Sequence, residues 1–99
     1  MKVEIRKFGE ILTSRQSGRE AYAAFQPTFR QLGANEELIL DFEGVQVLSP
    51  SWADEFITPL FQTLSDRLIL TSTANLSVKL TIETLEGILK RTFIVRSDE

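Results

Sequence analysis

The sequence predicts one α/β layered domain, with a mixed, mostly parallel central sheet of four to five strands covered by about three helices. Short apolar runs with the period of a strand alternate along the chain with longer segments that have the period of a helix. Such alternation favours parallel strands joined by right-handed helical crossovers. The 99 residues suffice for one domain and are too few for two ordinary ones.

Composition restricts the classes of function. The net charge of −3 provides no basic surface for nucleic acid or anionic lipid. The chain has no cysteine and no histidine, which removes the usual nucleophile, general base and zinc ligands. No apolar run approaches the roughly 18 residues of a membrane span, and no signal-peptide core is present. We therefore expect a cytoplasmic protein that uses no metal and no cofactor.

The N-terminal segment is predicted to form an edge of the sheet. Residues 2–8 alternate polar and apolar side chains, which is typical of a strand with one face in water. A tight turn at Gly9 would let residues 11–13 pair back as a short second strand. We therefore expect a hairpin at one sheet edge.

The first helix is predicted from its cap and its spacing. Ser17 followed by Glu20 fits a capping box, and Gly33 is a natural stop. Pro27 interrupts the segment, where it removes one backbone hydrogen bond. Apolar residues at helical spacing would form the buried face: Tyr22, Phe25, Phe29 and Leu32.

Residues 38–42 form the segment around which the rest of the chain is organised. They are apolar except for Asp41, as expected for a mid-sheet strand covered on both faces. Asp41 could be a buried functional acid, or it could accept backbone hydrogen bonds in the turn that follows. Apolar residues of the next loop would anchor it to the core: Val45, Val47 and Leu48.

The second helix has two possible N-caps. One is Ser49 with Pro50 at the first helical position, and the other is Ser51 with Asp54 three residues later. In either case Asp54 and Glu55 would lie in the first turn, where carboxylates interact well with the helix dipole. Apolar residues then recur three and four apart and predict one buried face: Ala53, Phe56, Ile57, Leu60, Phe61 and Leu64.

The C-terminal third continues the alternation. Residues 67–72 form a second apolar run, which predicts a parallel strand. Residues 76–89 fit a strand and a helix equally well. Because parallel strands need a covering crossover, we predict a helix, capped by Asn75 and ending near Gly87. Residues 92–95 would form a last edge strand.

Two segments in the middle of the chain resemble a known family. Residues 40–45 read LDFEGV and residues 48–56 read LSPSWADEF. These segments resemble STAS domains, the fold of anti-sigma-factor antagonists, and are most similar to a STAS-like bacterial family of unassigned function. Ser14 and Arg15, before the first helix, also match that family. The resemblance implies a STAS-like layered fold over most of the chain.

For anti-sigma-factor antagonists the resemblance implies regulation by partner switching. A serine at the start of the helix after the central strand is phosphorylated by a histidine-kinase-like ATPase, which is itself the anti-sigma factor. The phosphate places nearly two negative charges where the partner must dock. In this sequence the acceptor position falls on Pro50, and Trp52 replaces a common glycine. Ser51, and after it Ser49, are therefore the candidate phosphorylation sites.

We accordingly predict a regulatory, non-enzymatic module that binds a protein, either a histidine-kinase-like ATPase or a transcription regulator. The partner-binding residues are predicted at the start of the second helix: Ser49, Pro50, Ser51, Trp52, Asp54 and Glu55. Trp52 could anchor a partner, since tryptophan dominates interface hot spots, or pack over the strand end. The serines could be caps alone, and the two acids could be favourable helix charges alone.

Two other classes of function are open to the sequence. A small-molecule or nucleotide sensor would use the carboxyl ends of the strands, with Asp41 and Arg15 as ligand-binding residues. The chain has no glycine-rich phosphate loop to support a nucleotide. An enzyme would instead pair Asp41 with Asp54 or Glu55 as general acid and base. We expect no catalytic residue.

Overall fold

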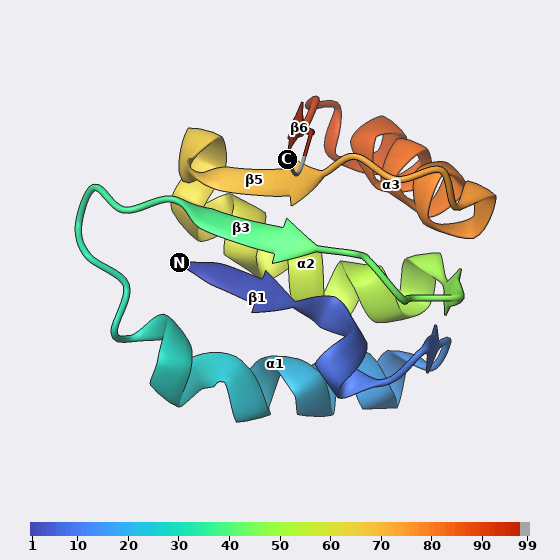
Figure 1. Ribbon diagram of the computed structural model, residues 1–99, viewed down its shortest axis with the longest axis horizontal. Helices are drawn as coiled ribbons and strands as arrows, with labels where there is room; N and C mark the ends of the chain where they lie inside the picture. The colour runs from blue at the N-terminus through green and yellow to red at the C-terminus, as the bar shows by residue number, and fades with distance from the viewer. Residues whose placement is uncertain (98–99) are drawn as a thin grey trace.

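The computed structural model describes residues 1–97 and arranges them as a parallel sheet with helices packed against it (Figure 1). Within these residues the strands of the central sheet lie in the order β1 (Lys2–Glu4), β3 (Leu38–Asp41), β5 (Leu68–Thr71) and β6 (Ile94–Arg96). The helices are α1 (Arg15–Phe29), α2 (Pro50–Leu64) and α3 (Leu76–Leu89). α2 packs against both α1 and α3. The predicted α/β fold with a mostly parallel sheet is confirmed.

The apolar segment 38–42 lies mid-sheet, as predicted, because β3 is paired with β1 on one side and with β5 on the other. Val3, Leu40 and Leu70 occupy these three strands on one face and belong to a single core. All three helices contribute buried side chains to that core, among them Phe25, Trp52, Phe56, Val78 and Leu85. The helices therefore cover one face of the sheet.

Side chains cover the other face. The strand register places Ile39, Ile69 and Ile94 in one row there. Ile69 lies in the middle of this row and is only 1 % exposed. An ion pair between Arg96 and Glu37 joins β6 to the residue before β3, across the intervening β5. The expected cover by other elements is therefore found on one face, where the helices lie, and the other face within residues 1–97 carries the strands' own side chains.

The N-terminal hairpin that we predicted is wrong. The predicted strand over residues 2–8 stops at Glu4, and a 3₁₀ helix, η1 (Ile5–Phe8), follows. Residues three apart share a face in such a helix, so Ile5 and Phe8 both turn toward the core, whereas a strand would separate them. β2 (Ile11–Leu12) then pairs in parallel with β4 (Val47–Leu48) as a separate two-stranded sheet.

The first helix starts and stops earlier than predicted. Ser14 is its N-cap, and the Ser14 Oγ accepts a hydrogen bond from the Ser17 amide at 2.9 Å. The predicted capping box of Ser17 and Glu20 is therefore wrong. Either serine could cap a helix, but the end of β2 places Ser14 where the helix begins. The helix also ends before the predicted stop at Gly33.

The C-terminal third agrees with the prediction. Residues 76–89 are helical throughout, and the Asn75 side chain caps them by accepting from the Val78 amide at 3.1 Å. Gly87 lies inside the helix, which ends where Lys90 adopts a left-handed conformation with φ of 56°. β6 is the predicted edge strand. Among the described residues, no helix combines the length and apolar character that crossing a membrane requires.

Candidate functional site

The β2–β4 pair brings the starts of α1 and α2 together. Leu12 pairs with Leu48, and the residues that follow each strand lead directly into a helix. The Ser49 amide donates to the Leu12 carbonyl at 2.9 Å, and the Ser49 hydroxyl donates to the Thr13 carbonyl at 2.8 Å. We did not predict β4. Its signal is a repeated pattern, in which two apolar residues stand shortly before a capping serine in both places.

Ser49 is the N-cap of α2, so the first of the two predicted caps is the one used. Its Oγ accepts a hydrogen bond from the Trp52 amide at 3.2 Å, and Pro50 occupies the first turn. Ser51 is half-buried inside the helix, and its hydroxyl makes no hydrogen bond within residues 1–97. With Ser49 as cap, Asp54 and Glu55 fall beyond the first turn, which contains no acid. The predicted first-turn placement of these carboxylates is wrong.

Trp52 is buried, with 0 % of its surface exposed. Its ring packs against Phe8 and Phe56, with centroids 6.2 and 5.0 Å away. A Cβ at Gly18 would lie 2.6 Å from the Trp52 carbonyl oxygen, so this glycine permits close contact between α1 and α2. The predicted role of Trp52 as a partner anchor is therefore wrong, and the residue packs inside the core between α1 and α2 and not over the strand end. Its position four residues before Phe56 was the available signal.

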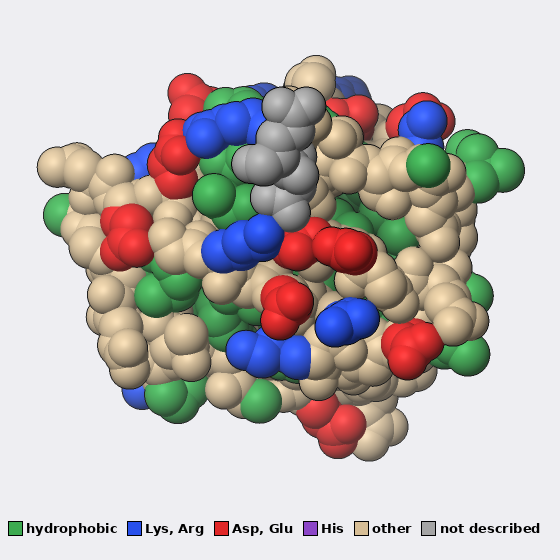
Figure 2. All heavy atoms as spheres, in the orientation of Figure 1, with side chains coloured by type: hydrophobic (Ala, Val, Ile, Leu, Met, Phe, Trp, Pro, Cys, Tyr) green, Lys and Arg blue, Asp and Glu red, His purple; other side chains and the backbone are tan. Residues whose placement is uncertain are grey.

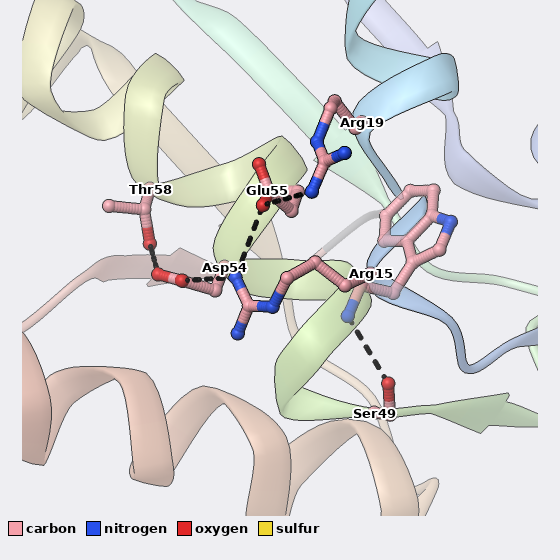
Figure 3. Close-up of polar contacts among 7 residues, drawn as sticks. Arg15, Arg19, Ser49, Asp54, Glu55 and Thr58 are labelled. Carbon is pink, nitrogen blue, oxygen red and sulfur yellow. Dashed lines mark hydrogen bonds and ion pairs between the residues drawn. The ribbon is translucent and has the colours of Figure 1, made fainter. Parts of the chain in front are cut away.

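The two acids of α2 are held by arginines of α1 (Figure 3). Arg15 Nη1 lies 2.9 Å from Asp54 Oδ2 and 3.2 Å from Glu55 Oε1, and Arg19 Nη2 lies 3.5 Å from Glu55 Oε1. The hydrogen bond from Arg15 lowers the pKa of Asp54, and a hydrogen bond from the Thr58 hydroxyl contributes to the same shift. The hydrogen bonds of Arg15 to Asp54 and Glu55 raise the pKa of Arg15. We call these four residues, Arg15, Arg19, Asp54 and Glu55, the charged cluster.

Asp41 lies elsewhere, at the end of β3, and is 4 % exposed. Its Oδ1 accepts from the Glu43 amide at 3.0 Å and from the Thr71 hydroxyl at 3.4 Å, and its Oδ2 is 3.6 Å from Lys2 Nζ. The structural reading of Asp41, as an acceptor in the following turn, is confirmed. None of these contacts is with Arg15 or with the acids of α2. The predicted ligand pair and the predicted acid pair are therefore not in contact.

Metal binding finds no support in the described part of the chain, where no three Asp or Glu side chains group as metal ligands. Arg15 is the ligand-binding residue expected for a small-molecule or nucleotide sensor. Its guanidinium is instead occupied by two carboxylates of the same chain. An anion would have to compete with both of them.

An exposed apolar surface surrounds the helix starts, and sequence reasoning missed it. Ile11 of β2 is 64 % exposed, and Leu76 at the start of α3 is 66 % exposed. Val47 and Leu80 are also exposed, so the predicted anchoring of Val47 in the core is wrong, whereas Val45 and Leu48 are buried as expected. In Figure 2 several separate apolar side chains lie along the right-hand edge, where Figure 1 places α3 and the segment that leads from β3 into α2.

Hydrogen bonds fix α3 beside this surface. The Ser77 hydroxyl accepts from the Leu48 amide at 3.0 Å, and the Thr81 hydroxyl donates to the Leu48 carbonyl at 2.5 Å. The Asn75 side chain donates to the carbonyls of Val45 and Gln46, both at 3.0 Å. Leu76 and Leu80 are the exposed apolar residues next to these hydrogen-bonding residues in the sequence of α3.

Comparison with family models matches residues 19–82 to a STAS-like domain of unknown function (DUF4325). The match runs from the first part of α1 to the middle of α3, and it contains all of β3, β4, α2 and β5. No curated protein and no solved structure matches the chain.

Proposed function

Because this chain belongs to the family of STAS-like domains of unknown function, we propose that it is a regulatory module that acts by binding another protein and not by catalysis. One observation carries the proposal: exposed apolar side chains surround two helix starts that are bonded to each other through Ser49 and Thr13. We define the docking surface by its residues: Ile11, Val47, Ser49, Pro50, Ser51, Leu76 and Leu80.

The composition of the docking surface suits a protein partner. Contiguous exposed apolar side chains on a small domain are typical of interaction sites, and polar groups commonly form their rim. Ile11, Leu76 and Leu80 supply the apolar part. The charged cluster of α1 and α2 lies beyond the first turn of α2 and supplies a polar rim. Trp52 has no part in this surface because it is buried.

The partner that we propose is a histidine-kinase-like ATPase or a transcription regulator, by resemblance to the anti-sigma-factor antagonists. A switch of that kind would act through Ser51. Phosphorylation of Ser49 would disrupt a hydroxyl that already makes two hydrogen bonds, whereas the Ser51 hydroxyl is uncommitted within residues 1–97. A phosphate on Ser51 would interact favourably with the helix start and would place about two negative charges beside Ile11 and Leu76.

The test uses a histidine-kinase-like ATPase as the candidate partner. The two proteins are mixed without nucleotide, with ADP and with ATP, and complexes are measured by size-exclusion chromatography with light scattering. We expect a complex that dissociates when ATP is added. The mass of this chain should rise by one phosphate at the same time. Absence of a complex in all three conditions would overturn the proposed partner.

Matched variants locate the interface. Ile11→Glu places a charge on the docking surface and should abolish the complex. Ile88→Glu makes the same change at an exposed site near the far end of α3 and should leave binding intact. Equal effects of the two variants would contradict the docking surface. Ser51→Ala should keep the complex in ATP, and phosphate found at another residue would refute the switch while leaving the docking surface standing.

A further inference from the structure

A groove runs along α3 on a side that the docking surface does not use. Its cavity measures about 310 Å³ and is lined by apolar side chains of the core, of α3 and of β6, which are Phe42, Leu70, Val78, Ile82 and Val95. A second cavity of about 260 Å³ lies around Asp41 at the end of β3. Thr71, Ser72 and Thr73 line both cavities, so the two adjoin at the end of β5.

The position and size of this groove fit a small ligand. Parallel sheets bind ligands at the carboxyl ends of their strands, and this groove lies where β3 and β5 end. Binding pockets typically measure about 300–1,000 Å³ and combine an apolar lining with a few polar groups. The apolar floor would contact the body of a ligand, and the Ser72 hydroxyl would hydrogen-bond to its polar end.

The charges at the groove favour a cation. Four carboxylates line the two cavities, from Asp41, Glu43, Glu83 and Glu86, against one ammonium, from Lys79. Asp41 already lies 3.6 Å from the Lys2 ammonium, so the other carboxylates matter more. Glu86 is half-buried and is held in place because its Oε2 accepts a hydrogen bond from the Phe93 amide at 2.9 Å. A carboxylate that is already ordered loses little side-chain entropy when it pairs with a ligand.

We propose that this groove binds a small organic cation with an apolar body, of the class of primary amines that carry an aromatic or aliphatic group. The ammonium pairs with Glu86 and Glu83, and the apolar body lies against Ile82 and Val95. A phosphate-bearing ligand such as a nucleotide is disfavoured because the same carboxylates repel it. The proposal is separate from the docking surface and requires no protein partner.

The experiment is a titration followed by amide NMR, with phenethylamine as the probe. The neutral analogue 2-phenylethanol and the anionic analogue 3-phenylpropanoate have a similar shape. We expect saturable shifts at residues 72–73, 79–86 and 95 with phenethylamine, and binding about tenfold weaker or more for both analogues, since hydrogen bonds to charged groups contribute that much. Equal binding of the three probes, or shifts confined to other residues, would overturn the proposal.

Two variants test the groove itself. Glu86→Gln keeps an acceptor for the Phe93 amide but removes the charge, and it should weaken phenethylamine binding about tenfold. Val95→Lys adds a competing ammonium at an exposed residue of β6, so it should abolish binding without unfolding the chain. Glu20→Gln, an exposed carboxylate of α1, is the matched control and should change nothing. Unchanged binding in the folded Val95→Lys variant would refute the site.

Discussion

α2 and α3 have nearly the same length, 15 and 14 residues, but they serve the molecule differently. α2 buries seven residues, from Trp52 to Leu64, whereas α3 buries only three. α3 instead leaves Leu76, Leu80 and Ile88 exposed. Since the middle helix has neighbours on both sides, its substitution should mainly change stability. Substitution of the outer helix should mainly change binding.

This contrast changes where function is to be sought. The sequence analysis places the candidate partner-binding residues at the start of α2, but only the first turn of that helix belongs to the docking surface. α3 contacts both candidate sites. Its polar side chains bind the backbone of residues 45–48 beside the docking surface, and Ile82 and Glu86 line the groove. A helix with few buried residues is therefore the element that physically connects the two sites.

The largest expected effect on stability comes from Trp52→Ala, which would leave a cavity where the Trp52 ring packs in the core. Loss of a buried aromatic side chain destabilises a protein by about 3–5 kcal/mol. Leu80→Ala on the exposed side of α3 is the control and should change stability by no more than about 0.5 kcal/mol. Urea unfolding followed by circular dichroism measures both. Similar losses in the two variants would break the comparison of the helices.

Gly→Ala substitutions should have opposite signs in the two regions. At Gly18 the added Cβ would lie 2.6 Å from the Trp52 carbonyl oxygen, which is backbone and cannot rotate away. We expect Gly18→Ala to destabilise the fold by about 1–3 kcal/mol. At Gly87 nothing lies within 4 Å of an added Cβ, so Gly87→Ala should stabilise α3 by about 0.5–1 kcal/mol. Thermal unfolding of both variants measures the two effects. Changes in melting temperature of the same sign would contradict the prediction.

A smaller effect should separate the two serines at the start of α2. Ser49→Ala removes the cap and should cost about 1 kcal/mol, because the Trp52 amide loses its acceptor. Ser51→Ala removes a hydroxyl without a hydrogen bond in residues 1–97 and should leave the free energy of unfolding nearly unchanged. The same denaturation experiment measures both. If Ser51→Ala proved the more damaging change, Ser49 would not be the effective cap.

Periodicity predicted the elements that bury a continuous apolar face. Residues 38–42 and 67–72 are dense enough in apolar side chains to identify β3 and β5, and the spacing of residues 53–64 identifies α2. The crossover argument resolved residues 76–89 correctly as a helix, because two parallel strands cannot be joined directly.

Short and non-local features were not predictable in the same way. β2 and β4 have two residues each, and neither has a period of its own, so only their mutual pairing defines them. That pairing also selects Ser14 over Ser17 as a cap. The contacts of Arg15 with Asp54 and Glu55 span 39 and 40 residues, and no local pattern reports them. Trp52 is different, since its helical spacing to Phe56 did indicate burial.

The smallest effect concerns the exposed side of α2 and depends on pH. The Arg15 hydrogen bond lowers the pKa of Asp54 below its ordinary value of 3.8. A lowered pKa means that Asp54 stabilises the folded state above the unfolded pKa, and that this contribution disappears as pH falls through the folded pKa. Asp54→Asn should therefore be slightly less stable than the native chain at pH 7, and the two should converge once the pH falls below the lowered pKa of Asp54. Because these side chains are partly in water, screening keeps the difference small, and added salt should reduce it further. A difference in stability between the two proteins that grows toward acid pH would contradict this prediction. It would show that the charged cluster destabilises Asp54 in the folded state. The exposed side of α2 would then affect stability in a way that its contacts do not suggest.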